Sequence, residues 1–88
     1  MNILYIYRIK RIDKKTRNTI KRRFYYNLNK ITQNNTTKVF RSTFYINPNK
    51  ETEIDRFFNE FSEWVDVFKT RIESFEFIIG KHETNIDN

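Results

Sequence analysis

The sequence predicts an α+β domain in which an antiparallel sheet carries two helices. Segments of alternating side chains and segments with an apolar residue every three or four positions succeed one another along the chain. Polar, turn-forming residues at 32–37 and 47–49 separate them. The 88 residues, of which 38% are hydrophobic, suffice for one small core. We therefore expect a single domain.

The first half of the chain begins with a predicted strand and helix. Residues 3–9 carry apolar and aromatic side chains on both faces, as in a strand covered on two sides. Asp13 stands where the N-cap of a helix over about residues 14–30 is expected. An apolar stripe with spacings of four, four and three marks the face of this helix that we expect to be buried. The stripe consists of Ile20, Phe24, Leu28 and Ile31.

A second strand region and a second helix follow. Residues 38–46 favour strand, and a kink at residues 41–42 would split this region into two short strands. The Asn-Pro-Asn turn at 47–49 ends it, since proline cannot donate to a sheet ladder. Asn49 is expected to cap a helix over about residues 50–63.

The last predicted elements are two strands. Alternation returns at residues 65–72, and a short terminal strand is expected at 75–79. The order β-α-β-β-α-β with an extra C-terminal strand is that of a ferredoxin-like domain, here spanning residues 1–80. Residues 81–88 are polar and are expected to form a flexible tail. This fold hosts many functions, so the function has to be inferred from side chains.

Positive charge is concentrated in the first half of the chain. Residues 1–41 contain 12 Lys and Arg and one acid, a net charge of +11, whereas residues 42–88 contain 5 Lys and Arg and 10 acids, a net charge of −5. Uncompensated charge of one sign repels itself and opposes folding, which predicts a polyanion as partner. The residues expected to contact nucleic-acid phosphates are Arg8, Lys10, Arg11, Lys14, Lys15, Arg17, Lys21 and Arg22.

Two plainer interpretations stay open. Scattered Lys and Arg residues often form a solvated face that binds nothing. Alternatively, the acidic second half binds a protein partner and the basic half is incidental. The salt dependence of nucleic-acid affinity distinguishes these interpretations from phosphate binding, because phosphate-driven binding weakens steeply as the salt concentration rises.

The five tyrosines are predicted to be core or interface residues. Stacking on unpaired bases is the alternative role for such rings. Most of the five lie at positions with an apolar pattern, which favours packing. They are Tyr5, Tyr7, Tyr25, Tyr26 and Tyr45.

The sequence predicts no catalytic residue, metal site or cofactor. Ser42 has no histidine partner, because His82, the only histidine, lies in the polar tail. The acids Asp66, Glu73 and Glu76 lack the spacing of metal ligands. Without cysteine there is no disulfide or thiolate site. No run is long enough to span a bilayer and no signal peptide is visible, so we expect a cytoplasmic protein without a membrane partner.

Four segments occur here in an order that is found in one known family. The first strand ends in Tyr7-Arg8-Ile9, and Thr16-Arg17-Asn18 leads the basic helix. A strand centred on Arg41-Ser42-Thr43-Phe44 follows, and the second helix carries the run from Asp55 to Phe61. From Asn2 to about Ile79, the chain thus resembles the small CRISPR-associated adaptation protein of the Cas-two family.

The resemblance implies a symmetric homodimer that acts as a scaffold. In the family, the terminal strand of each subunit pairs with the sheet of the other, and the small dimer sits between two dimers of the Cas-one integrase. Duplex DNA lies across its basic surface during the capture of new CRISPR spacers. The CRISPR subtype, the preference for DNA or RNA and the docking place of the integrase stay open. The interface residues implied are Phe75, Phe77, Ile78 and Ile79.

One position departs from the family pattern. Many members carry an aspartate between the Tyr and Ile that end the first strand, where two copies across the dimer can hold a divalent cation. This chain has Arg8 there, and a guanidinium repels a cation. The resemblance therefore implies DNA binding without nuclease activity. The alternative is a metal-dependent endonuclease or endoribonuclease of the same fold, VapD-like, with Asp13 or Ser42 in its site and Mg²⁺ as cofactor.

Overall fold

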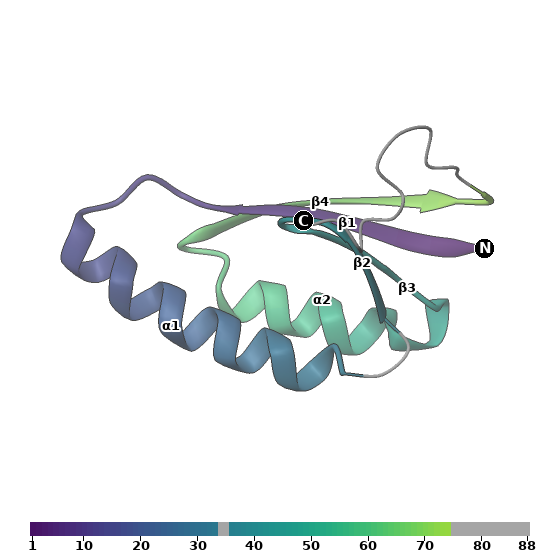
Figure 1. Cartoon of the computed structure of the whole chain (residues 1–88), viewed down its shortest axis with the longest axis horizontal. Coiled ribbons are helices and arrows are strands. Elements are labelled where there is room, and N and C mark those ends of the chain that lie inside the picture. The colour runs from purple at the N-terminus through teal and green to yellow at the C-terminus, as the bar shows by residue number, and fades with distance from the viewer. Residues whose placement is uncertain (34–35, 75–88) are drawn as a thin grey trace, which may run out of the picture.

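The computed structural model of the protein describes residues 1–33 and 36–74. It is a small α+β domain in which a four-stranded antiparallel sheet, in the order β2-β3-β1-β4, carries both helices on one face (Figure 1). This architecture is compatible with the predicted ferredoxin-like fold. The predicted strand at 75–79 and the tail at 81–88 lie outside the described residues. The elements are β1 (Asn2–Ile9), α1 (Lys14–Ile31), β2 (Thr36–Phe40), β3 (Thr43–Ile46), the 3-10 helix η1 (Pro48–Lys50), α2 (Glu51–Glu60) and β4 (Val65–Ile72).

The core lies between the helices and one face of the sheet. In β1, Ile3, Tyr5 and Tyr7 alternate with less buried residues and pack against both helices. The prediction that this strand is covered on two sides is not met by the described residues, since Ile6 is 44% exposed. The reason is topological: both helices lie on the same face, so the even-numbered positions of β1 face away from them (Figure 1).

The start and the buried face of α1 agree with the prediction. The carboxylate of Asp13 accepts a hydrogen bond of 3.0 Å from the backbone N–H of Thr16, and that N–H lowers the pKa of Asp13. Three residues of the predicted stripe are buried, and the fourth, Ile31, packs against the core from its edge. Tyr26 is 65% exposed, so it lies outside the core of the single chain, and its place in an interface stays a prediction.

The region predicted as a kinked strand is a hairpin. β2 begins at Thr36, so the predicted loop is shorter than expected, and residues 41–42 separate β2 from β3. Ser42 has a φ of 63°, in the left-handed region that favours glycine. This backbone conformation, together with a register shift between Lys38 and Phe40, reverses the chain within two residues.

The cap of the second helical segment differs from the prediction by two residues. The side chain of Asn47, not of Asn49, accepts the capping hydrogen bond, at 3.1 Å from the backbone N–H of Asn49. Pro48 occupies the first turn, where its fixed φ suits a helix start and its missing N–H costs nothing. A 3-10 turn therefore precedes α2, and α2 ends at Glu60 rather than at residue 63.

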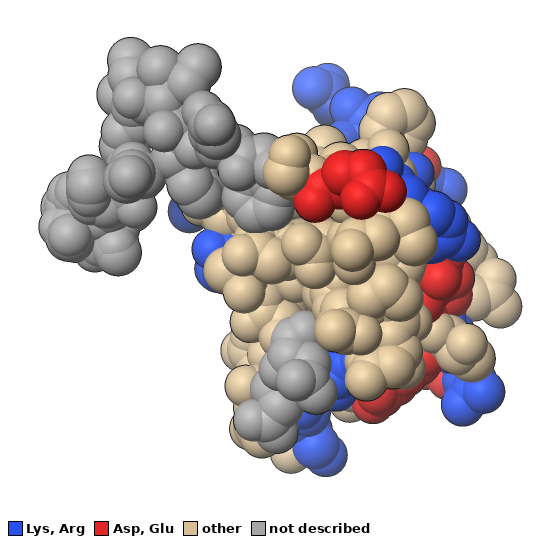
Figure 2. Space-filling view, turned by 90° about the vertical axis from the view of Figure 1, so that its right-hand side faces the viewer, with Lys and Arg blue, Asp and Glu red and all other residues tan. Residues whose placement is uncertain are grey.

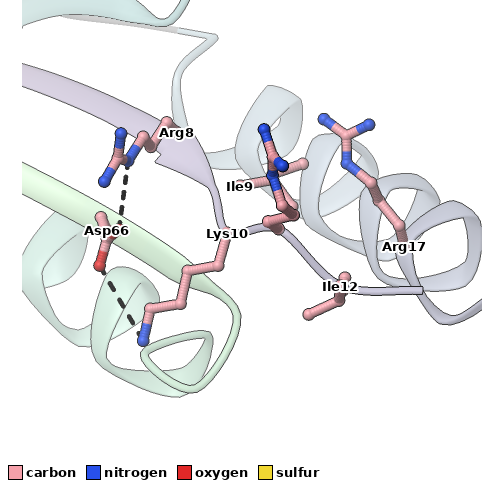
Figure 3. A pocket seen from close by; sticks show the side chains of 7 residues that line it. Arg8, Ile9, Lys10, Ile12, Arg17 and Asp66 are labelled. Atoms are coloured by element: carbon pink, nitrogen blue, oxygen red, sulfur yellow. Dashed lines mark hydrogen bonds and ion pairs between the residues drawn. The ribbon is translucent and has the colours of Figure 1, made fainter. Parts of the chain in front are cut away.

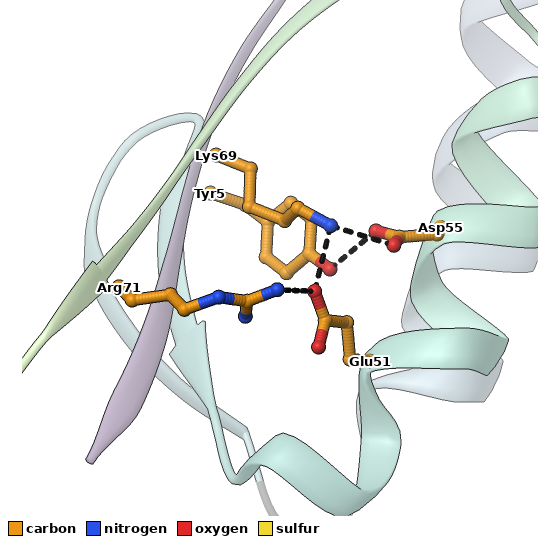
Figure 4. Close-up of polar contacts among 5 residues, drawn as sticks. All are labelled: Tyr5, Glu51, Asp55, Lys69 and Arg71. Atoms are coloured by element: carbon orange, nitrogen blue, oxygen red, sulfur yellow. Dashed lines mark hydrogen bonds and ion pairs between the residues drawn. The ribbon is translucent and has the colours of Figure 1, made fainter.

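A polar network joins the edge strand β4 to α2 (Figure 4). Lys69 lies 2.7 Å from both Glu51 and Asp55, and Arg71 lies 2.8 Å from Glu51. Arg71 first, and then Lys69, lower the pKa of Glu51 to about 2. The hydroxyl of Tyr5 donates to Asp55 at 2.6 Å, so the network also reaches the centre of the core.

Charged side chains are unevenly placed on the surface. Figure 2 looks onto the end of the molecule where the N-terminus lies, and there Lys, Arg, Asp and Glu lie around the rim of an uncharged centre. None of the described helices has both the length and the apolar character that a membrane crossing requires.

Candidate nucleic-acid interface

Three segments meet at the end of the sheet opposite to the N-terminus: the end of β1, the start of α1 and the turn between β2 and β3. They meet because β3 is the antiparallel neighbour of β1, with Thr43 opposite Ile6. The backbone N–H of Tyr7 donates to the carbonyl of Ser42 at 3.0 Å, which fixes the turn beside β1. The chain between β1 and α1 then leads directly into the basic helix.

A first cavity of about 650 Å³ lies under this connection. Its apolar wall is formed by Ile9 and Ile12, and Asp66 of β4 is the one acidic residue that the described part of the chain contributes to the lining. Figure 3 shows Lys10 pointing towards Asp66 and away from Arg17. The four basic residues that line the cavity are all predicted phosphate contacts: Arg8, Lys10, Arg11 and Arg17.

Asp66 partly neutralises this cavity. Its carboxylate lies 3.2 Å from Nε of Arg8 and 3.9 Å from Nζ of Lys10. The Arg8 side chain is 81% exposed, and an ion pair this exposed contributes at most about 1 kcal/mol. Arg8 can therefore exchange the carboxylate for a phosphate at little energetic cost.

A second cavity, of about 460 Å³, adjoins the first and shares Arg8, Ile9 and Arg17 with it. Among residues 1–33 and 36–74, no carboxylate lines it. We call it the cationic cleft, and within the described part of the chain no acidic side chain forms an ion pair with any of its cations except Arg8. Its five cations are Arg8, Arg17, Lys21, Lys38 and Arg41.

The helical period divides the basic residues of α1 into two groups. Arg17, Lys21 and Tyr25 are spaced by four residues, so they lie on one flank of the helix, and all three line the cationic cleft. The remaining predicted contacts on the helix, Lys14, Lys15 and Arg22, are exposed and line neither cavity. The prediction named five residues of this helix as phosphate contacts, and two of them, Arg17 and Lys21, line the cleft.

Three side chains with hydroxyl groups complete the lining of the cleft, namely Tyr7, Tyr25 and Ser42. Tyr7 is buried, and its ring packs against that of Tyr25 at a centroid distance of 6.4 Å. Burial first, and then the neighbouring Tyr25, raise the pKa of Tyr7, whereas a hydrogen bond with Ser42 lowers it, and the hydroxyl of Tyr7 remains protonated. The cleft thus combines positive charge with hydroxyl groups.

The residues named for a catalytic alternative lie apart from each other. Asp13 caps α1 and lines neither cavity. Ser42 lines the cationic cleft, to which the described residues contribute neither a histidine nor a carboxylate. Across residues 1–33 and 36–74, no cluster of three histidine or acidic side chains is arranged to hold a metal ion.

The sequence prediction missed Lys38 and Arg41. Both belong to the basic first half, but they lie outside the dense run of cations that ends at Lys30. The strand order places their hairpin beside β1, and only that order brings them to Arg17 and Lys21. The signal that could have found them is the predicted ferredoxin-like topology, in which the strand after the first hairpin turn neighbours the first strand.

No protein-family model, curated protein or solved structure matches this chain. The implied dimer-interface residues, Phe75, Phe77, Ile78 and Ile79, lie outside the described residues.

Proposed function

We propose that this protein is a non-catalytic scaffold that binds the phosphate backbone of nucleic acid through the cationic cleft. One observation carries the proposal: five cations from three separate segments converge on a concave surface to which the described residues contribute no carboxylate. Such an arrangement repels itself in the free protein and is neutralised by a polyanion. Phosphate contacts of this kind position a strand without reading its bases.

The more specific part of the proposal follows the family resemblance. In it, the protein acts in the cytoplasm in a CRISPR spacer-acquisition complex, and it holds duplex DNA between Cas-one integrase subunits. The order of the elements supports this at the level of fold only. Arg8, which replaces the aspartate of the family, lines the cleft and serves there as a phosphate contact.

A second copy of the chain is proposed to cover the open face of the sheet. Ile6 and Phe68 are cross-strand partners on this face and are 44% and 75% exposed. Burial of these two large apolar side chains against the same surface of a two-fold partner would remove them from water. A chain of this length buries little apolar surface alone, which favours association.

The dimer is tested by light scattering of the full chain. We expect the wild type to have the mass of a dimer and Phe68→Glu to have that of a monomer, because the glutamate would be buried unpaired in the interface. Phe68→Leu keeps the surface apolar and is the matched control. A monomeric wild type at micromolar concentration would contradict this part of the proposal.

Nucleic-acid binding is tested by two double variants of the same helix. Arg17→Glu with Lys21→Glu reverses two charges in the cationic cleft. Lys15→Glu with Arg22→Glu reverses two exposed charges that line neither cavity, with the same change in net charge. In anisotropy titrations with a short DNA duplex at low salt, we expect the cleft variant to lose at least about tenfold in affinity and the control clearly less.

The salt dependence of the wild type gives a second measurement. If all five cations contact phosphates, the logarithm of the association constant for a duplex falls with the logarithm of the salt concentration with a slope of about −4 to −5. Equal losses in both double variants would mean that the cleft has no special role. Binding that does not respond to salt would refute the proposal as a whole.

A further inference from the structure

We infer that the cationic cleft seats the phosphorylated end of a nucleic-acid strand. This inference rests on the proposed function and adds which part of the strand is bound. Five cations and three side chains with hydroxyl groups line a hollow of about 460 Å³. A hollow of this volume has room for a compact charged group, whereas an extended backbone is usually bound along an open surface.

The charge and the oxygen atoms of a terminal phosphate match this lining. Such a group carries about −1.5 to −2 charges near pH 7 and three strong acceptor oxygens. An internal phosphodiester carries a single charge and offers fewer free oxygens. Three of the five cations are arginines, whose forked N–H donors bind phosphate oxygens in pairs. One terminal phosphate can therefore accept hydrogen bonds from several of these donors at once, whereas several internal phosphates would be needed to engage the same donors.

The burial of the lining side chains favours a strand end as well. Tyr7 is buried and Tyr25 partly buried, whereas the Lys and Arg residues of the lining are exposed. The phosphates in the middle of a duplex lie along its convex outer surface and can reach such exposed cations. A group that projects from a strand end can also approach the more buried part of the lining.

The adjoining cavity provides a path for the rest of the strand. It shares Arg8, Ile9 and Arg17 with the cleft, and Arg11 and Ile12 also line it. The arginines can contact the following phosphates, and the isoleucines offer an apolar surface to a sugar or base. The two adjoining cavities can thus bind the strand end and the nucleotides that follow it.

The test uses duplexes of one sequence that differ only at their ends: hydroxyl groups at every end, a 5′-phosphate, or a 3′-phosphate. By anisotropy at moderate salt, we expect one phosphorylated form to bind the full-length wild type at least fivefold more tightly than the hydroxyl form. Lys38→Gln with Arg41→Gln is expected to abolish this preference, because it weakens the binding of the phosphorylated form more than that of the hydroxyl form. Lys15→Gln with Arg22→Gln is the matched control and keeps the preference.

The outcomes separate this inference from the proposed function. Equal affinity for the three duplexes overturns the inference, and the proposed function stands if their binding still falls with salt. Failure to bind any of the duplexes overturns both. Inorganic pyrophosphate is added as a competitor: if it displaces the phosphorylated duplex as effectively as an unlabelled phosphorylated oligonucleotide does, the cleft is a site for small anions and the inference falls.

Discussion

The hydrogen bond between Tyr5 and Asp55 can be tested through its two partners. Tyr5 is 1% exposed, and its hydroxyl donates to Asp55 at 2.6 Å (Figure 4). Tyr5→Phe removes the hydroxyl but keeps the ring between Phe44 and Phe58, whose centroids lie at 5.4 and 5.5 Å. Asp55 keeps Lys69 as a partner and has access to water, so we expect this change to lower the free energy of unfolding by only about 1 kcal/mol.

Removing the other partner is expected to cost more. Asp55→Ala leaves a buried hydroxyl without an acceptor, a penalty of about 1–3 kcal/mol. It also breaks the ion pair with Lys69, which is worth at most about 1 kcal/mol at this exposure. We therefore expect a loss of about 2–3 kcal/mol in the wild type and of less than about 1 kcal/mol when Tyr5→Phe is already present.

Urea unfolding of the wild type, both single variants and the double variant measures this difference. The m-values have to agree, so that shifts in the midpoint report free energy. A coupling of about 1–2 kcal/mol between the two substitutions is the expected result. Strictly additive losses would refute the reasoning, because they would mean that Tyr5 and Asp55 do not interact in solution.

Two further predictions concern pH and backbone strain. Glu51 has its pKa lowered from 4.5 to about 2 by Arg71 and Lys69, so its contribution to stability is complete above pH about 4.5 and is lost as the pH falls towards 2. Thermal unfolding should therefore show a smaller decrease over this range in Glu51→Gln than in the wild type; parallel curves would contradict the network. At Ser42, where φ is 63°, Ser42→Gly is expected to change stability by less than about 0.5 kcal/mol, whereas Ser42→Val lowers it by about 1–2 kcal/mol. Chemical denaturation measures both, and equal stability of the two variants would speak against this backbone conformation.

Sequence patterns predicted the helices and strands well where all the residues that form the pattern lie within a few positions of one another. The cap at Asp13 and the apolar stripe of α1 depend on residues three or four positions apart, and both agree with the structure. The ends of β2 and α2 were less accurate. These ends depend on the backbone conformation of the hairpin turn and of the 3-10 turn at Pro48. The same turn-forming residues are compatible with several backbone conformations, so the sequence does not fix the ends.

Composition by itself determined that the first half of this chain is strongly basic, because charge is a sum over residues and needs no coordinates. It also determined which helix carries most of that charge. Only the tertiary structure decided which cations act together. Lys38 and Arg41 are far from Arg17 in the chain, and they line one cleft with it because β3 pairs with β1 and carries the hairpin turn to the start of α1. Long-range strand pairing of this kind depends on the packing of the whole core, which no short stretch of sequence specifies.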